Sequence, residues 1–241
     1  MLGRLKRLFL KPESASAPLF ISQHQQLEVP NLAVGWENGT PTDEIGPPGD
    51  EYQRLFQRAI ARSRQLGLYT GDFSIVSGCI LNQGSIKRVQ RALRRIIGLM
   101  LGGNSSHLAG QCFTVCSNLE NALQGEFRFN PIVTLGGVYG FKGRMFGIDI
   151  EVLEAAVAQG AQATQESIDL HAWLTFPTGE IVDPTLLSTM AVKGYDIGVP
   201  SGLRKLVFGQ PKNILNLRYE PLVIGSGLFD RLGMVRGWLI S

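Results

Sequence analysis

Residues 171–185 read HAWLTFPTGEIVDPT, two short apolar runs joined by a turn. The runs DLHAWLTF and EIVDPTL alternate in the manner of β-strands, and the turn PTGE supplies Gly179 for a positive φ. Because both runs are short and their connection is tight, we expect an antiparallel hairpin. This hairpin would carry His171 on one arm and Asp183 at the end of the other, within reach of each other.

Upstream, residues 109–123 read AGQCFTVCSNLENAL and place Cys112 at the start of a predicted helix. A thiol with a pKa near ~8.5 is mostly protonated at neutral pH, and a helix N-terminus beside an imidazole favours its thiolate. His171 can supply that imidazole, and Asp183 behind it would fix the tautomer and stabilise the imidazolium. The free backbone N–H groups of the helix start, including that of Cys112, point where an oxyanion would develop.

At these positions the chain resembles a known group of enzymes. GQCF is similar to the Gly-Gln-Cys-Trp signature of transglutaminases, and HAWLTFPTGEIVDPT resembles the His-x-Trp strand and following Asp strand of the transglutaminase-like cysteine-triad superfamily, compact microbial type. The resemblance covers roughly residues 105–190. It implies that Cys112 is the acylated nucleophile, His171 the general acid/base and Asp183 the residue that orients it. It also implies a transglutaminase-like, papain-like core.

Side chains beside the triad keep two interpretations each. Gln111 is a candidate second oxyanion donor, or its side chain points away from the site. On an alternating strand, the side chain of Trp173 points to the same face as that of His171, so it lines a substrate groove or packs at the site wall. Cys116 lies one helical turn after Cys112, where we expect packing rather than a resolving thiol, because positions i and i+4 are poorly placed for a disulfide.

Neither a metal nor a cofactor is expected. His107, Cys112 and Cys116 can be written as a ligand cluster, but the chain has no Cys-x-x-Cys pair and its spacing matches no zinc pattern. Three cysteines are also too few and odd in number for a disulfide framework. Together with the lack of an apolar run long enough to cross a bilayer, this predicts a cytoplasmic protein without stable membrane insertion, or an effector exported without a signal peptide.

The composition predicts an ordinary globular chain, with 44% hydrophobic and 18% charged residues among 241. Residues 112–190 hold nine acidic against three basic side chains, which mildly favours a neutral or cationic substrate. The helix predicted from residue 85 has a basic face, which consists of Lys87, Arg88, Arg91, Arg94 and Arg95. No aromatic residues interleave with these bases, so we expect a solvated face and no nucleic acid.

The predicted fold class is α+β, with N-terminal helices packed on an antiparallel sheet. Residues 1–49 are rich in Pro, Gly, Ser and Asn and predict an irregular arm, and residues 50–241 form the catalytic domain. Helices are expected from Asp50 to Gly67, from residue 85 and from residue 149, and strands after residue 130. In the tail, NILNLRYEPLVIG is expected to form a strand and MVRGWLI an edge strand.

Two function classes follow. The first is an enzyme that forms a thioester from a peptide or glutaminyl amide, which makes it a protease, a deamidase or a transglutaminase according to substrate and acceptor. The second is a catalytically silent module that keeps the fold and binds without turnover. The expected partner is a protein or peptide substrate, and the oligomeric state is left open.

Overall fold

The computed structural model describes residues 48–69, 71–100, 108–128, 130–140, 143–160, 169–194, 206–214 and 216–232. The predicted irregular arm, apart from its last two residues, lies outside this part of the chain. His107 of the rejected ligand cluster and the predicted edge strand MVRGWLI also lie outside it.

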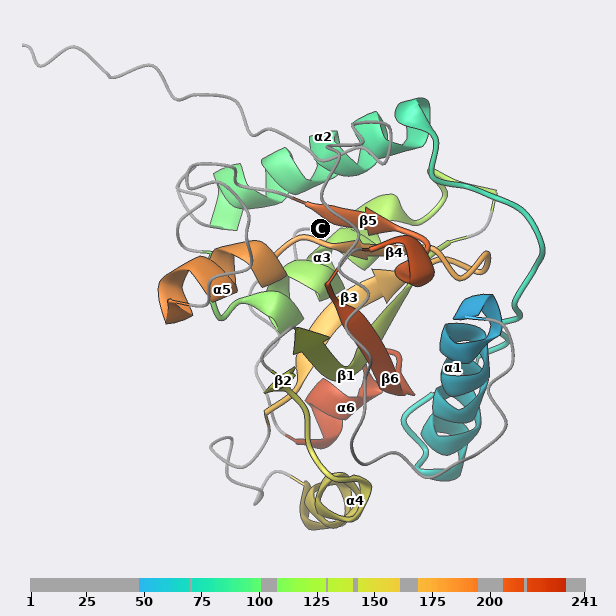
Figure 1. The fold of residues 1–241 in the computed structure, drawn as a ribbon, viewed down its shortest axis with the longest axis vertical. Helices are drawn as coiled ribbons and strands as arrows, with labels where there is room; N and C mark the ends of the chain where they lie inside the picture. The colour runs from blue at the N-terminus through green and yellow to red at the C-terminus, as the bar shows by residue number, and fades with distance from the viewer. Residues whose placement is uncertain are drawn as a thin grey trace, which may run out of the picture.

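The described residues form six α-helices and six strands, joined by turns and loops (Figure 1). The helices are α1 (Pro48–Gln65), α2 (Gln83–Met100), α3 (Cys112–Leu123), α4 (Ile150–Gln159), α5 (Leu186–Lys193) and α6 (Gly227–Arg231), with a 3₁₀ turn η4 (Pro211–Asn213). The strands are β1 (Ile132–Gly140), β2 (Gly143–Phe146), β3 (His171–Thr175), β4 (Ile181–Asp183), β5 (Val207–Gly209) and β6 (Arg218–Ile224). No helix in these ranges is long and apolar enough to span a membrane.

One antiparallel sheet organises the fold. Strand β1 pairs with β3 and β2 through its two halves along one edge and with β6 along its opposite edge, and β4 and then β5 follow β3. The predicted hairpin is confirmed, since β3 and β4 pair antiparallel through Leu174 and Val182, and Gly179 in its turn has a φ of 78°. The predicted α+β class with an antiparallel sheet is therefore confirmed.

Helices cover both faces of the sheet, because strand side chains alternate between them. One face packs Leu135, Ala172 and Leu174 against a core that α2, α3, α4 and α6 complete. The other face carries Trp173 and Ile181 under α1 and α5. Figure 1 shows α2 above α3 and β5, and α1 beside β6.

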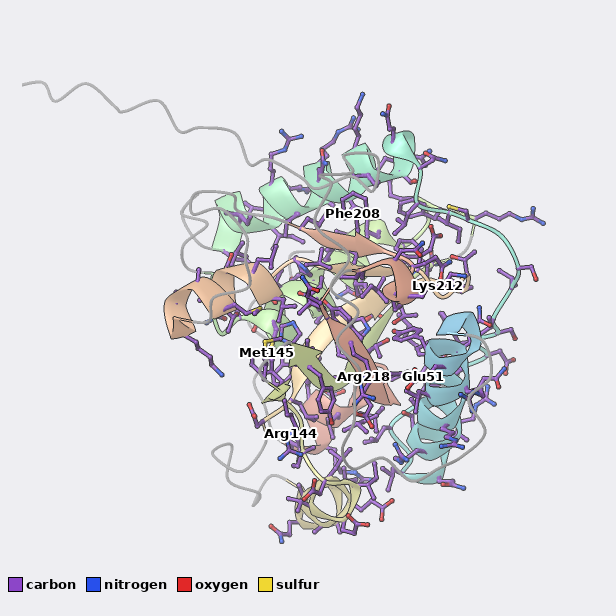
Figure 2. The ribbon with its side chains drawn as sticks, viewed as in Figure 1. Glu51, Arg144, Met145, Phe208, Lys212 and Arg218 are labelled. Carbon is purple, nitrogen blue, oxygen red and sulfur yellow. The ribbon has the colours of Figure 1, made fainter. Side chains whose placement is uncertain are left out.

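The two long N-terminal helices follow the predicted pattern. In α2 the buried side chains Val89, Leu93 and Ile96 recur at helical spacing, and the five basic residues are exposed. The predicted start of α1 at Asp50 is two residues late, because the helix begins at Pro48, where a proline suits the first turn. Side chains of α1 reach the sheet edge, and Figure 2 shows Glu51 beside Arg218 of β6, with Oε1 and Nη1 3.9 Å apart.

A glycine in β1 sets how closely β6 approaches the rest of the sheet. Gly136 pairs with His171 on one side and with Pro221 on the other. A Cβ atom at Gly136 would collide with the backbone carbonyl of Glu220. The missing side chain lets β6 lie tight against β1, which brings Tyr219 over the end of the hairpin.

Candidate active site

Asp183 is the hub of the candidate site, and it is fully buried at the end of β4. Its Oδ1 accepts the backbone N–H groups of Thr185 and Leu186, both at 3.0 Å. Its Oδ2 accepts the Nε2–H of His171 at 2.7 Å and the hydroxyl of Tyr219 at 3.0 Å. Four donors therefore hold this carboxylate, and the two backbone donors lie at the start of α5.

His171 opens β3, and its imidazole is buried beside two aromatic rings. The ring stacks on Phe146 at 4.8 Å between centroids and lies 6.4 Å from the centroid of Trp173. Nε2 is bound to Asp183, whereas Nδ1 is buried and has no well-aligned hydrogen-bond partner among the described residues. The free nitrogen is thus the one available to a reacting group.

Cys112 is the first residue of α3 and is 8% exposed. One turn later, the Cys116 thiol donates to the carbonyl of Ala172 at 3.3 Å, which fixes the helix start against the first residues of β3. Gly110 has a φ of 74° and lets the chain turn sharply into the helix. The first N–H groups of α3 have no partner within the helix and so remain available to an oxyanion.

The structure brings Cys112, His171 and Asp183 together. Burial lowers the pKa of His171, but the charge and hydrogen bond of Asp183, together with the Cys112 sulfur as an acceptor for the imidazolium, outweigh it and raise the pKa to about 10. The imidazole is therefore protonated at neutral pH and able to stabilise a neighbouring thiolate.

No protein-family model, curated protein or solved structure matches this chain.

The two flanking candidates have different outcomes. Gln111 is exposed at the N-cap of α3, and its backbone N–H donates to the carbonyl of Leu108 at 3.1 Å. Only its side-chain amide is left as an oxyanion donor. Trp173 is fully buried, and its Nε1–H donates to the hydroxyl of Tyr52 at 2.9 Å. This placement favours the packing interpretation over a groove-lining role, because the ring is enclosed in the core and its one donor is already bound to Tyr52.

The other two thiols sit in environments that oppose ionisation. Burial raises the pKa of Cys116 well above its ordinary range. Cys79 is exposed, but its thiol donates to Glu180 Oε1 at 2.9 Å, and this hydrogen bond, with burial and the carboxylate charge, raises its pKa to about 11. Neither thiol has the imidazole neighbour that Cys112 has.

Sequence reasoning missed two residues of the site. Tyr219 shares Oδ2 of Asp183 with His171. Phe146 stacks on the imidazole, and Lys193 Nζ lies over the Phe146 ring, 4.4 Å from its centroid. The alternation of NLRYEPLVIG placed Tyr219 on a strand, but nothing in the sequence connects that strand to β4. Their roles depend on contacts between segments far apart in the chain.

A pocket of about 350 Å³ lies elsewhere, where α1 and the start of α4 meet β1, β2 and β6. Its lining mixes three arginines with three acids, and it includes none of Cys112, His171 and Asp183; the charged residues are Arg58, Arg62, Arg144, Asp149, Glu151 and Glu220. Within the described ranges, no three His, Cys, Asp or Glu side chains gather as a metal site would require.

Proposed function

We propose that this chain is a cysteine-dependent acyl-transfer enzyme with a transglutaminase-like, papain-like core, acting on a peptide or glutaminyl amide. The observation that carries the proposal is the buried 2.7 Å contact between His171 Nε2 and Asp183 Oδ2, with Cys112 against the same ring. A helix that starts at the cysteine, followed by antiparallel strands that carry the histidine and the aspartate, is also the order that the resemblance implies.

In the acylation step, the Cys112 sulfur attacks the amide carbonyl carbon and forms a C–S bond. Because the imidazole is protonated at neutral pH, the proton already lies on Nδ1 of His171, the ring nitrogen that Asp183 leaves free, and the sulfur attacks as a thiolate. The oxyanion is stabilised by the first backbone N–H groups of α3 and by the side-chain amide of Gln111. The C–N bond then breaks, the amine leaves with the proton from His171, and Cys112 carries a thioester.

In the second step, water or an amine attacks the thioester carbonyl and gives its proton to His171. The C–S bond breaks, and the Cys112 sulfur leaves as a thiolate beside the imidazolium of His171, which restores the starting state. Water as the acceptor makes the enzyme a protease or deamidase, and an amine makes it a transglutaminase. Asp183 stays ionised throughout and stabilises the imidazolium.

Alkylation of the folded protein tests this proposal. At neutral pH, iodoacetamide should modify Cys112 faster than Cys79 or Cys116, because those two thiols have raised pKa values and no imidazole partner. Intact mass and peptide mapping would follow the wild type, Cys112→Ala and, as a matched control, Cys79→Ala. Equal labelling of all three thiols, or labelling of Cys116 alone, would instead favour the catalytically silent module.

A further inference from the structure

We propose that Tyr219 is a positioning residue of the triad, which controls through Asp183 Oδ2 how tightly the imidazolium of His171 is held. The inference deepens the proposed function and rests on it. Its basis is that one carboxylate oxygen accepts both the Tyr219 hydroxyl at 3.0 Å and His171 Nε2–H at 2.7 Å.

The contact is built into the core. Tyr219 is 2% exposed, and its ring packs edge-on against Trp173 with centroids 5.1 Å apart. It comes from β6, which joins β1 on the side away from β3, so the sheet delivers this hydroxyl from a segment remote from the hairpin. The remaining oxygen of Asp183 is engaged by the start of α5. Besides His171 itself, Tyr219 is therefore the donor to Asp183 that comes from a strand rather than from the start of α5.

The two donors compete for the same oxygen. A hydroxyl that donates to a carboxylate disperses its negative charge and lowers its proton affinity. With Tyr219 in place, Asp183 attracts the imidazolium less strongly than it would alone. His171 can then give its proton to the leaving amine more readily, because an imidazolium that is held too tightly is a weak acid.

Several titratable groups surround His171, and they come from five packed elements. Among the described residues they are Asp183 of β4, Cys112 and Cys116 of α3, Tyr219 of β6, Tyr52 of α1, and Lys193 of α5, which reaches the site through Phe146. A substitution that tests Tyr219 must leave the other groups in place.

Tyr52 provides the matched control. It is also a buried tyrosine whose hydroxyl makes two hydrogen bonds, but its partners are Trp173 and Thr175 rather than Asp183. Phenylalanine at either position removes a buried hydroxyl and keeps the ring. Only Tyr219→Phe removes a donor from the carboxylate.

The experiment follows the titration of His171 by NMR in protein labelled with ¹⁵N-histidine. The chain has three histidines, and His171→Gln identifies the signal. A Cys112→Ala background is used, because the Cys112 thiol contributes to the raised pKa of His171 and its removal brings the midpoint to lower pH. We expect Tyr219→Phe to raise the midpoint by about half a pH unit or more, and Tyr52→Phe to leave it unchanged.

A second measurement does not depend on the folding of Tyr219→Phe. Replacing the five tyrosines by 3-fluorotyrosine makes each hydroxyl a stronger donor, so the His171 midpoint should fall, and this fall should persist in Tyr52→Phe. An unchanged midpoint in Tyr219→Phe, an equal rise in both phenylalanine variants, or a rise with fluorotyrosine overturns the proposal.

The proposed function is checked separately in chains that keep Cys112. The alkaline limb of Cys112 alkylation should move to higher pH in Tyr219→Phe, and not in Tyr52→Phe. Alkylation of wild-type Cys112 no faster than that of Cys79, with the midpoints as expected, would contradict the proposed function and the catalytic part of this inference, while the hydrogen-bond competition would stand.

Discussion

Two buried carboxylates lie at the two ends of the three-residue strand β4, and each has a cysteine nearby. Glu180 comes just before the strand and accepts the Cys79 thiol, the backbone N–H groups of Ile80 and Leu81, and the Thr178 hydroxyl. Asp183 ends the strand and reaches Cys112 only through His171. A direct contact between acid and thiol raises the pKa of Cys79, whereas the charge of Asp183 raises the pKa of the intervening imidazole, which is therefore cationic at neutral pH.

A carboxylate next to a thiol therefore does not by itself make that thiol a nucleophile. Without an imidazole, the negative charge opposes thiolate formation, and the pair serves as a structural clamp between the loop before α2 and the hairpin turn. With the imidazole between them, the same charge stabilises a neighbouring cation.

Removing the imidazole or the thiol should have the largest effect. Cys112→Ala should abolish acyl-enzyme formation, and His171→Ala should reduce it by roughly 10⁴-fold or more, because members of a triad act as a unit. The measurement is turnover of a glutaminyl or peptide amide substrate, together with thermal melts. Full activity in His171→Ala with a parent-like melt would rule out the mechanism.

Changing one carboxylate at a time compares the two ends of β4. Asp183→Asn should lower acylation by about 10³-fold or more, because an amide cannot accept from Thr185 and Leu186 with one atom and from both Nε2–H and Tyr219 with the other. The matched Glu180→Gln change should leave acylation within about threefold and lower stability by about 2 kcal/mol, through loss of charge-assisted hydrogen bonds. A larger activity loss in Glu180→Gln than in Asp183→Asn would reverse the assignment.

The sign of the His171 shift predicts how stability depends on pH. Its folded pKa lies above the ordinary value of 6.5, so its contribution is complete below pH 6.5 and is lost as the pH rises through about 10. In Cys112→Ala, where no thiolate offsets the imidazolium, the unfolding free energy should fall by up to about 1.4 kcal/mol per pH unit above pH 6.5. Urea unfolding of Cys112→Ala with and without His171→Gln measures this.

If the difference in unfolding free energy between Cys112→Ala and the same chain with His171→Gln does not change from pH 6.5 to 8, the raised pKa of His171 would be contradicted. That window is chosen because Cys116 and Tyr219 also have raised pKa values, and their contributions decline only at higher pH, where these groups ionise in the unfolded chain.

The smallest expected effect concerns the thiol of the clamp. Glu180→Gln weakens the hydrogen bond to Glu180 and removes the carboxylate charge, which together with burial raise the pKa of Cys79 to about 11, so alkylation of Cys79 should accelerate by about tenfold at neutral pH. The rate at Cys112 serves as the internal control and should not change. Slower labelling of Cys79 would show that access to the thiol, rather than the charge, governs its reactivity.

Sequence periodicity was sufficient for the elements that bury a regular stripe. The buried positions of α2 and the alternation of β3 and β6 are local patterns, and the start of α3 at Cys112 follows from the turn at Gly110. The sequence did not reveal β2, β5, α5 or α6. β5 has only three residues and is defined by pairing with β4, and α5 continues a run that alternates like a strand until Pro184.

The same limit applies to the candidate site. His171 and Asp183 could be paired from the sequence because a short turn joins their strands, and the structure places them 2.7 Å apart. Tyr219 is 36 residues from Asp183, and Glu180 binds a loop about 100 residues upstream. Such contacts depend on sheet order, which side-chain alternation along one segment does not encode.

The double attachment of Asp183 couples the site to local unfolding. Its Oδ1 holds the first turn of α5 and its Oδ2 holds His171, so fraying of that turn releases the residue that orients the imidazole. Such an opening requires only part of the global unfolding free energy. On mild heating or in low denaturant, the proposed acyl-transfer activity should then be lost before the bulk helical signal. The amides of Thr185 and Leu186 should exchange with deuterium at a rate that matches this loss of activity.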